Sequence, residues 1–288
     1  MHSTQRFVLF LAAQARRFPL KDAVDLGRQL GKSPQSVRAC VNRLARSGIL
    51  VREPSPRKAA CYALSPKGEA MAADVAAKFM RIHDIVERKH VWDGTWTLVS
   101  FGIPEKIRDR RDELRRRLRE IGFGQWAGGV WIAAGDATRS VSGVVDSLRV
   151  AGRVMVSASK DVTVGGKPVA SAVSRIWPLS DLNRRYASMR TRLKRRIERM
   201  RTRIEKGSPP DSREAFLEVF VLFSEAAEII TLDPCLPEGL LPDNWLGLEV
   251  QDLIHEYFHM LYGLEQTDPY SFLLELPDGL HIPEPRKT

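Results

Sequence analysis

The chain has 288 residues, of which 43% are hydrophobic and 28% are charged, the ordinary composition of a globular protein with two or three small domains. Its three widely spaced cysteines exclude a disulfide framework and favour the reducing cytoplasm, and no apolar run reaches the roughly 18 residues of a membrane helix. Residues 1–68 contain 13 Lys and Arg but 3 Asp and Glu, which equals the entire net charge of +10 and predicts a polyanionic partner, most simply nucleic acid.

The first predicted element is a helix over residues 5–15. The stretch RFVLFLAAQA also resembles a signal peptide, because a basic residue precedes a short apolar run that ends at Ala13-x-Ala15. The apolar run is minimal, however, and Arg16 and Arg17 follow it at once. We therefore favour the first helix of a cytoplasmic domain over a cleaved signal.

A second helix is predicted over residues 20–30 and ends at Gly31. Ser33 is a favourable N-cap for the next helix, and Pro34 occupies its first position, where the missing N–H costs nothing. That third helix buries one face, because Val37, Val41 and Leu44 recur at helical spacing.

The opposite face of the third helix is a candidate for reading DNA. Arginine recognises guanine, glutamine and asparagine recognise adenine, and small residues allow close approach to the major groove. The candidate DNA-binding residues on this helix are Ser33, Gln35, Ser36, Arg38, Ala39, Asn42, Arg43 and Arg46.

A β-hairpin is predicted next, with strands at 49–52 and 60–64 and a basic tip at 54–58. Arg57 and Lys58 at that tip are expected to contact phosphates. Three helices followed by a hairpin predict a winged helix-turn-helix domain over residues 1–68 that binds a double-stranded DNA operator. The alternative is a small helical domain with an ordinary basic surface.

Residues 69–90 predict an amphipathic linker helix that connects or dimerises the DNA-binding units. Residues 91–175 then predict the order β-α-β-β-α-β, which is the ferredoxin-like fold. The first strand lies in WTLVSFGI, the first helix is rich in arginine, and a hairpin turns at Gly128-Gly129. A second helix and a last strand complete this middle domain.

The middle domain resembles that of the PaaX family of transcriptional repressors. The residues that carry the resemblance are Trp92-Asp93-Gly94, Trp96, Ile103-Pro104-Glu105, Ile121-Gly122-Phe123-Gly124 and Gly129-Val130-Trp131. A second block, LDPCLPEGLLPDNWLG at 232–247, is similar to the signature of the family's C-terminal domain. The resemblance spans nearly the whole chain and rests on two long motifs in the same order.

The resemblance implies a homodimeric repressor of catabolic genes, often genes for aromatic acids, and no enzymatic activity. The founding members of the family release DNA on binding an aryl-CoA thioester. The middle domain is also similar to the Cas2 nuclease fold, in which an aspartate after the first strand holds a metal. The matching residue here is Gly102, which has no ligand atom, so we expect no metal-dependent nuclease and no cofactor.

Residues 176–288 predict a helical effector or dimerisation domain. Residues 184–203 carry 10 basic and 1 acidic residue, and residues 204–288 carry 4 basic and 17 acidic residues. The basic helix is therefore expected either to pair with the acidic tail, which we favour, or to hold phosphates of a CoA. An aromatic head would need an apolar slot, for which the candidates are Trp126, Trp131, Trp177 and Trp245, and a free aromatic acid remains an alternative effector.

The segment HEYFH at 255–259 fits H-E-x-x-H, in which two histidines bind zinc and the glutamate acts as general base. A zinc hydrolase is therefore the competing hypothesis. The metzincin extension would need glycine at the position of Tyr262, and Glu275 is the only downstream carboxylate that we consider as a third ligand. We favour a coincidental match on a helix of the effector domain, with no bound metal.

Overall fold

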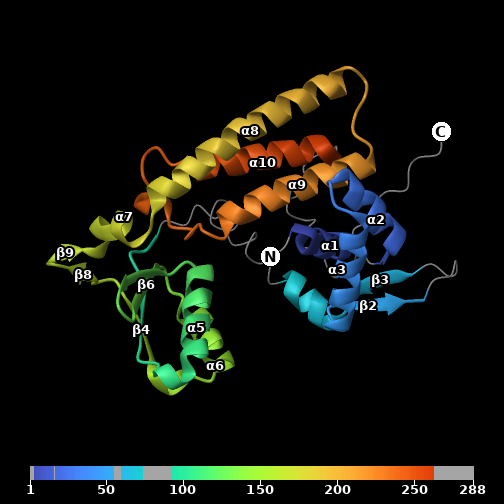
Figure 1. Ribbon diagram of the computed structural model, residues 1–288. Helices are drawn as coiled ribbons and strands as arrows, with labels where there is room; N and C mark the ends of the chain where they lie inside the picture. The colour runs from blue at the N-terminus through green and yellow to red at the C-terminus, as the bar shows by residue number, and fades with distance from the viewer. Residues whose placement is uncertain (1–2, 16, 55–59, 74–91, 263–288) are drawn as a thin grey trace. The chain divides into compact units, whose positions relative to one another are not determined.

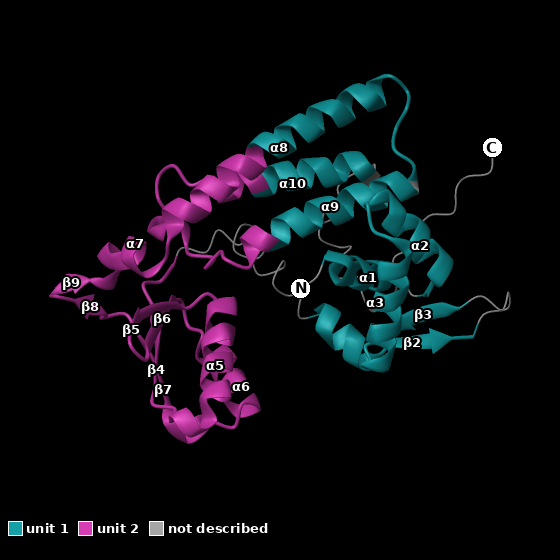
Figure 2. Cartoon of the chain, viewed as in Figure 1, with its two compact units in different colours: residues 1–80, 191–227, 251–288 teal, residues 81–190, 228–250 magenta. Residues whose placement is uncertain are grey.

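The computed structural model describes residues 3–15, 17–54, 60–73 and 92–262. It is an α+β chain that divides into two compact units, which are coloured separately in Figure 2. Unit 1 contains residues 1–80, 191–227 and 251–288, and unit 2 contains residues 81–190 and 228–250. Figure 1 gives the helices and strands of both units. No helix in the described ranges combines the length and the hydropathy needed to cross a bilayer.

The N-terminal part of unit 1 has the predicted order of three helices and a hairpin. The elements are α1 (Ser3–Gln14), α2 (Leu20–Gln29), α3 (Pro34–Arg46), β2 (Leu50–Glu53) and β3 (Cys61–Leu64). A two-residue strand, β1 (Phe18–Pro19), pairs with β3 and was not predicted, because two residues are too short to show a period. The hairpin tip at 55–59 and most of the predicted linker helix, 74–91, lie outside the described residues.

The RFVLFLAAQA segment forms the buried helix α1. Phe7 and Phe10 are buried and meet α9 (Ser212–Ile230), with ring centroids 5.5 Å apart for Phe7 and Phe220. Phe10 packs against Phe216 at 5.5 Å and against Phe223 at 5.0 Å. These aromatic contacts join the N-terminal helices to the helical part of unit 1, because large buried rings contribute strongly to core packing.

Unit 2 is built on an antiparallel sheet with the strand order β5-β6-β4-β7. Its elements, in the predicted β-α-β-β-α-β order, are β4 (Trp96–Phe101), α5 (Arg108–Glu120), β5 (Gly124–Ala127), β6 (Val130–Ala134), α6 (Thr138–Ser147) and β7 (Val154–Ser159). The predicted last strand extended to residue 164, but residues 163–164 form β8 (Thr163–Val164), which pairs with β9 (Lys167–Pro168). The short helix α7 (Val173–Ile176) was also not predicted.

The sheet of unit 2 is apolar on both faces. Val99 and Trp131 pack in one buried cluster with Leu114 and Leu118 of α5 and Val141 of α6. Neighbouring residues of the same strands face the other way, since side chains alternate along a strand. Trp96, Leu98 and Ile132 belong to a second cluster, which residues 169–179 and Leu236 cover.

The WDGTW motif forms the turn that leads into β4. The carboxylate of Asp93 accepts hydrogen bonds from the Thr95 backbone N–H at 2.9 Å and from the Thr95 hydroxyl at 2.7 Å. Lys160 Nζ lies 3.0 Å from the same carboxylate. The Thr95 bonds, and then the lysine, lower the pKa of Asp93 to about 2.

Replacement of Asp93 by asparagine should therefore destabilise the fold in a pH-dependent way. Because the folded pKa is depressed, the stabilisation is fully present above the unfolded pKa of about 3.9 and is lost as the pH falls towards 2. The melting temperatures of the wild type and Asp93→Asn should differ at neutral pH and converge in acid. A difference that stays constant down to about pH 3 would contradict this role of the carboxylate.

The C-terminal helices are joined by ion pairs between basic and acidic residues. Within unit 1, Arg196 of α8 (Leu179–Glu205) binds Glu225 of α9 at 2.9 Å, and Arg201 binds Glu256 of α10 (Gly247–Tyr262) at 2.9 Å. Pairing between the basic helix and the acidic tail is thus confirmed for these described residues. The apolar stripe predicted along α8 is buried from Tyr186 to Met200, but Ile204 at its end is 38% exposed.

The second family motif, 232–247, docks on the start of α8 within unit 2. Tyr186 donates a hydrogen bond of 2.5 Å to Asp233, a carboxylate that is only 8% exposed and also accepts from the Cys235 N–H. Asn183 accepts from the Leu246 N–H at 2.8 Å and donates to the Asn244 carbonyl at 2.9 Å. These bonds fix both ends of the motif to one helix.

Candidate nucleic-acid interface

Helix α3 begins with the predicted cap. Ser33 has extended backbone geometry, with φ −69° and ψ 144°, and its hydroxyl accepts a hydrogen bond of 3.1 Å from the Ser36 N–H. The Ser36 hydroxyl donates to the Ser33 carbonyl at 2.8 Å. Both side chains therefore define where the helix starts. Because their hydroxyl groups already make these local hydrogen bonds, they have fewer hydrogen bonds left for a ligand. The break before the helix lies at Gly31, where φ is +69°.

The inner face of α3 is closed by apolar residues. Val37, Val41 and Leu44 are buried, as their spacing predicts, and Cys40 is buried beside them. Burial raises the pKa of the Cys40 thiol, and the nearby Arg43 opposes that shift. The inner face therefore fixes the rotation of the helix and leaves the other side chains outside.

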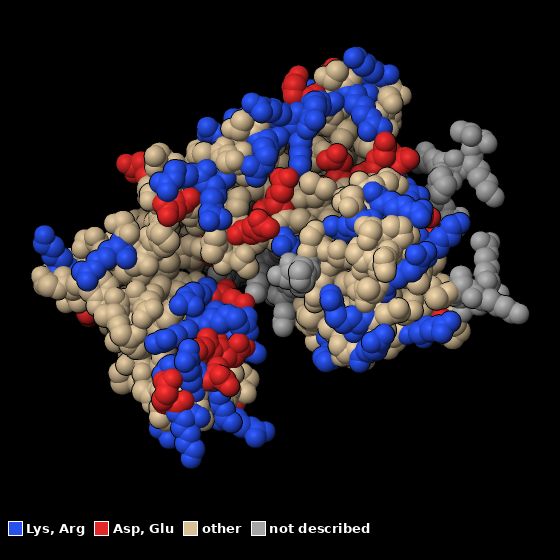
Figure 3. Space-filling model, in the orientation of Figure 1, with Lys and Arg blue, Asp and Glu red and all other residues tan. Residues whose placement is uncertain are grey.

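The outer face of α3 presents the predicted residues together. Seven of the eight are exposed, and Ser36 is half-buried; the exposed ones are Ser33, Gln35, Arg38, Ala39, Asn42, Arg43 and Arg46. Figure 3 shows Lys and Arg side chains over the α1–α3 part of the view, with few acidic side chains among them. The predicted tip residues Arg57 and Lys58 lie outside the described residues, so their position is not assigned.

The arginines of this face keep their charge available. Among the described residues, Arg38, Arg43 and Arg46 have no carboxylate partner, and Arg43 contacts only the Cys40 sulfur at 3.7 Å. Arg28 on α2 differs, because Asp25 lies 3.4 Å away. An unneutralised row of guanidinium groups on one helix face suits phosphate oxygens and guanine edges.

One further cation was not predicted. Lys67 donates a hydrogen bond of 3.0 Å to the Ser47 carbonyl at the end of α3. The sequence shows a basic residue there, but only the folded hairpin brings it to the helix end. Lys67 thereby extends the basic surface beyond Arg46.

Loss of the cap should weaken the fold without altering the outer face. Ser33→Ala removes the acceptor for the Ser36 N–H and should lower the free energy of unfolding by about 1 kcal/mol. Gln35→Ala is the matched control, because Gln35 is exposed and its substitution should change that free energy by less than about 0.5 kcal/mol. Urea unfolding of both variants measures the difference, and equal stability of the two would contradict the capping role.

The HEYFH segment lies on α10 and does not form a metal centre with other described residues. Glu256, the base in the zinc hypothesis, is engaged by Arg201, and Tyr257 and Phe258 face the core. The described residues contain no group of three or more His, Cys, Asp or Glu side chains placed to hold a metal. Glu275 lies outside the described residues.

Removal of metal should therefore leave the fold unchanged. A zinc site would couple binding energy to folding, so that chelation would lower the melting temperature. We expect the same melting temperature with and without a chelator, in the wild type and in His255→Ala. A chelator-dependent drop that His255→Ala abolishes would revive the zinc hypothesis.

Gly102 lies at the end of the first strand of the middle domain, directly after β4. Its N–H donates to the Arg153 carbonyl at 3.1 Å. This is the position at which the resemblance to Cas2 places a metal-binding aspartate.

Three family models match successive parts of the chain. They are the PaaX-like protein model over 7–68, the PaaX protein central Cas2-like domain over 89–173 and the PaaX-like protein C-terminal domain over 177–267. The chain belongs to the PaaX family. Its candidate nucleic-acid interface lies in the part matched by the N-terminal PaaX model, and motif 232–247 lies in the part matched by the C-terminal PaaX model.

Relatives of this PaaX-family chain include a curated protein and a solved structure. The transcriptional repressor PaaX of Escherichia coli K12 is 24% identical over 226 residues, which cover 78% of this chain and 68% of the repressor. The structure of the uncharacterized protein Rv0674 from Mycobacterium tuberculosis matches 94% of both chains, with 19% identity and a TM-score of 0.53. At that identity the structural match shows a shared fold.

Proposed function

We propose that this protein is a DNA-binding transcriptional repressor of catabolic genes and not an enzyme. The single observation that carries the proposal is the exposed face of α3, with three arginines that lack a carboxylate partner among the described residues. Membership of the PaaX family and the named repressor among its relatives support it. No finding favours the zinc hydrolase.

The elements α1 to β3 act in this proposal as a winged helix-turn-helix. Helix α3 enters the major groove, and the β2–β3 hairpin is the wing. The winged helix-turn-helix domain comprises residues 1–68. It is followed by the linker 69–90, the middle domain 91–175 and the helical domain 176–288. A homodimer of such chains reads two half-sites one helical turn, roughly 10 bp, or a multiple of it apart.

The repressor is released by a small-molecule effector, for which the resemblance favours an aryl-CoA thioester. Such an effector must bind the DNA-incompetent state more tightly than the competent state. The arginine-rich surfaces of α5 and α8 and the tryptophans of unit 2 support an anionic, aromatic ligand. The alternative effector is the free aromatic acid.

Footprinting of the DNA beside the protein's own gene tests the repressor function. We expect two protected half-sites with dyad symmetry. Arg38→Ala should weaken operator binding by about 1–3 kcal/mol and relax the preference at one base pair, because arginine reads a base edge. Absence of any protected site would contradict the proposal.

A matched control and a wing variant complete this test. Arg28→Ala removes another exposed arginine, on α2, that is already paired with Asp25, and it should leave affinity and specificity unchanged. Arg57→Ala should weaken binding to all sequences and flatten the salt dependence, because a phosphate contact releases counterions. A change in sequence preference alone for Arg57→Ala would show that the wing reads bases.

A further inference from the structure

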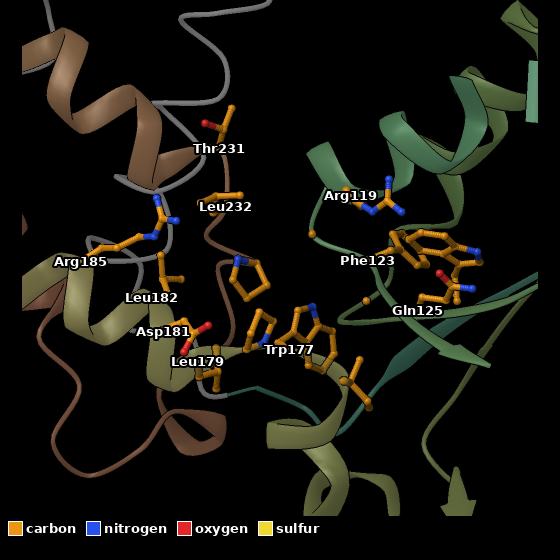
Figure 4. A pocket seen from close by; sticks show the side chains of 16 residues that line it. Arg119, Phe123, Gln125, Trp177, Leu179, Asp181, Leu182, Arg185, Thr231 and Leu232 are labelled. Atoms are coloured by element: carbon orange, nitrogen blue, oxygen red, sulfur yellow. The ribbon is translucent and has the colours of Figure 1, made fainter. Parts of the chain in front are cut away.

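A cavity of about 460 Å³ lies inside unit 2, at the edge strand of its sheet. Its walls come from three parts of the chain: the α5–β5 junction with β6, residues 176–185, and residues 231–234. Figure 4 shows Trp177 between Phe123 and Gln125 on one side and Leu182 and Leu232 on the other. All the lining residues belong to the same compact unit, and the size is in the range of small-molecule sites.

Two of the residues that line this cavity have buried indole N–H groups. Trp131 is 0% exposed and Trp177 is 5% exposed, and both line the cavity. Neither Nε1 has a hydrogen-bond acceptor among the described residues, although buried tryptophans normally find one. Both N–H groups are therefore available to donate a hydrogen bond to an acceptor from outside the chain.

Two cations of the cavity are also left without a carboxylate. Arg119 and Arg185 are exposed, and neither has an ion-pair partner within the described ranges. Their neighbours are neutralised: Arg117 binds Glu113 at 2.9 Å, and Arg184 binds Asp181 at 2.5 Å. Figure 4 shows Arg119 and Arg185 on opposite sides of the cavity in that view.

The remaining wall is mainly apolar, and its polar residues are Gln125, Thr231 and Asp181, the last of which is paired with Arg184. Phe123 and Leu182 are buried, and Leu232 is 56% exposed, an unusual exposure for a large aliphatic side chain. Arg119 also lies over the Trp131 ring, with its guanidinium carbon 5.1 Å from the ring centroid. An apolar body that enters the cavity would cover Leu232 and remove apolar surface from water.

We propose that this cavity is the effector site and that it takes a small anion with a planar apolar body. Arg119 and Arg185 hold the anionic group, and the N–H groups of Trp131 and Trp177 donate to its oxygen acceptors. This inference rests on the proposed function for its biological meaning, but the binding itself is independent of DNA. An aromatic carboxylate has both features, whereas its coenzyme A thioester keeps the aromatic body, replaces the carboxylate by a neutral thioester carbonyl and carries its negative charge on the coenzyme A phosphates.

The site is connected by the chain itself to the DNA-binding part. Thr231 and Leu232 directly follow α9, and the earlier residues of α9 hold Phe10 of α1 in unit 1. A ligand that fixes Leu232 therefore acts on the end of the helix that supports the N-terminal helices. Helix α9 is therefore the element through which ligand binding at Leu232 can influence DNA binding by the N-terminal helices.

Direct titration without DNA tests the site. The probes are phenylacetate, phenylacetyl-CoA and CoA alone, measured by calorimetry and by the emission of the tryptophans. The double variant Arg119→Gln/Arg185→Gln should bind at least about tenfold more weakly, because each arginine offers charge-assisted bonds. Its melting temperature without ligand should stay close to that of the wild type, since both side chains are exposed and the substitution loses only the contact of Arg119 with the Trp131 ring.

Two further variants keep the test decisive. Arg110→Gln alters an exposed arginine on the same helix that does not line the cavity, and it should bind like the wild type. Trp177→Phe removes one N–H and keeps a ring, so it should bind more weakly while remaining folded. Equal affinity of the double variant and Arg110→Gln would overturn the site.

The choice of probe separates the two ligand sources and the two proposals. If phenylacetate binds tightly, its carboxylate is the group that the arginines hold. If the thioester binds and CoA alone does not, the thioester is the ligand of the cavity. Binding of CoA alone with equal affinity, or of no probe, would overturn the proposed ligand class. Operator footprinting without ligand is unaffected by that outcome, so failure of the site and failure of the repressor function remain distinguishable.

Discussion

A sheet with apolar side chains on both faces must be covered twice, and the rest of unit 2 follows from this constraint. Helices α5 and α6 cover one face, where Val99 and Trp131 point. The second face, with Trp96 and Ile132, would be exposed in an isolated βαββαβ domain. The chain covers it with residues 169–179 and with Leu236. The middle domain is therefore completed by residues from the C-terminal part.

This second cover packs the two family motifs against each other in one buried cluster. The motif 92–131 builds the sheet, and the motif 232–247 returns to it through Leu236 and is held on α8 by Asp233. Gly124 shows how close the contact is. A Cβ atom at Gly124 would lie 2.3 Å from the Ile176 side chain and 2.8 Å from the Trp177 ring.

The elements that the sequence predicted well are those with strong local signals. Ser33 and Pro34 predict where α3 begins, and the spacing of its apolar residues predicts the buried face. The candidate DNA-binding residues are those that lie outside that face. Strand β1, the β8–β9 hairpin and α7 were missed because each is held by tertiary partners and is too short for a period. Helix α8 likewise begins at Leu179, earlier than its basic stretch indicates.

The pocket could be predicted only as a set of residue types. Of the four candidate tryptophans, Trp131 and Trp177 line it, whereas Trp126 lies under Arg175 and Trp245 packs on Tyr186. The arginines also fall into two groups, those that line the cavity without an ion pair among the described residues and those that are paired with a carboxylate. Which of them keep their charge depends on carboxylates three or four residues away and on side-chain rotamers, which composition does not reveal.

The missing side chain at Gly124 has a genetic consequence. An added methyl group would displace the Trp177 indole, which forms a wall of the proposed effector cavity, while α3 and its cap belong to the other unit. Under the proposed assignment, alleles with a larger residue at position 124 would form a non-inducible class. The repressed genes would stay repressed even when the inducing compound is supplied. A selection for strains that cannot grow on the inducing compound should recover them without touching the DNA-reading helix.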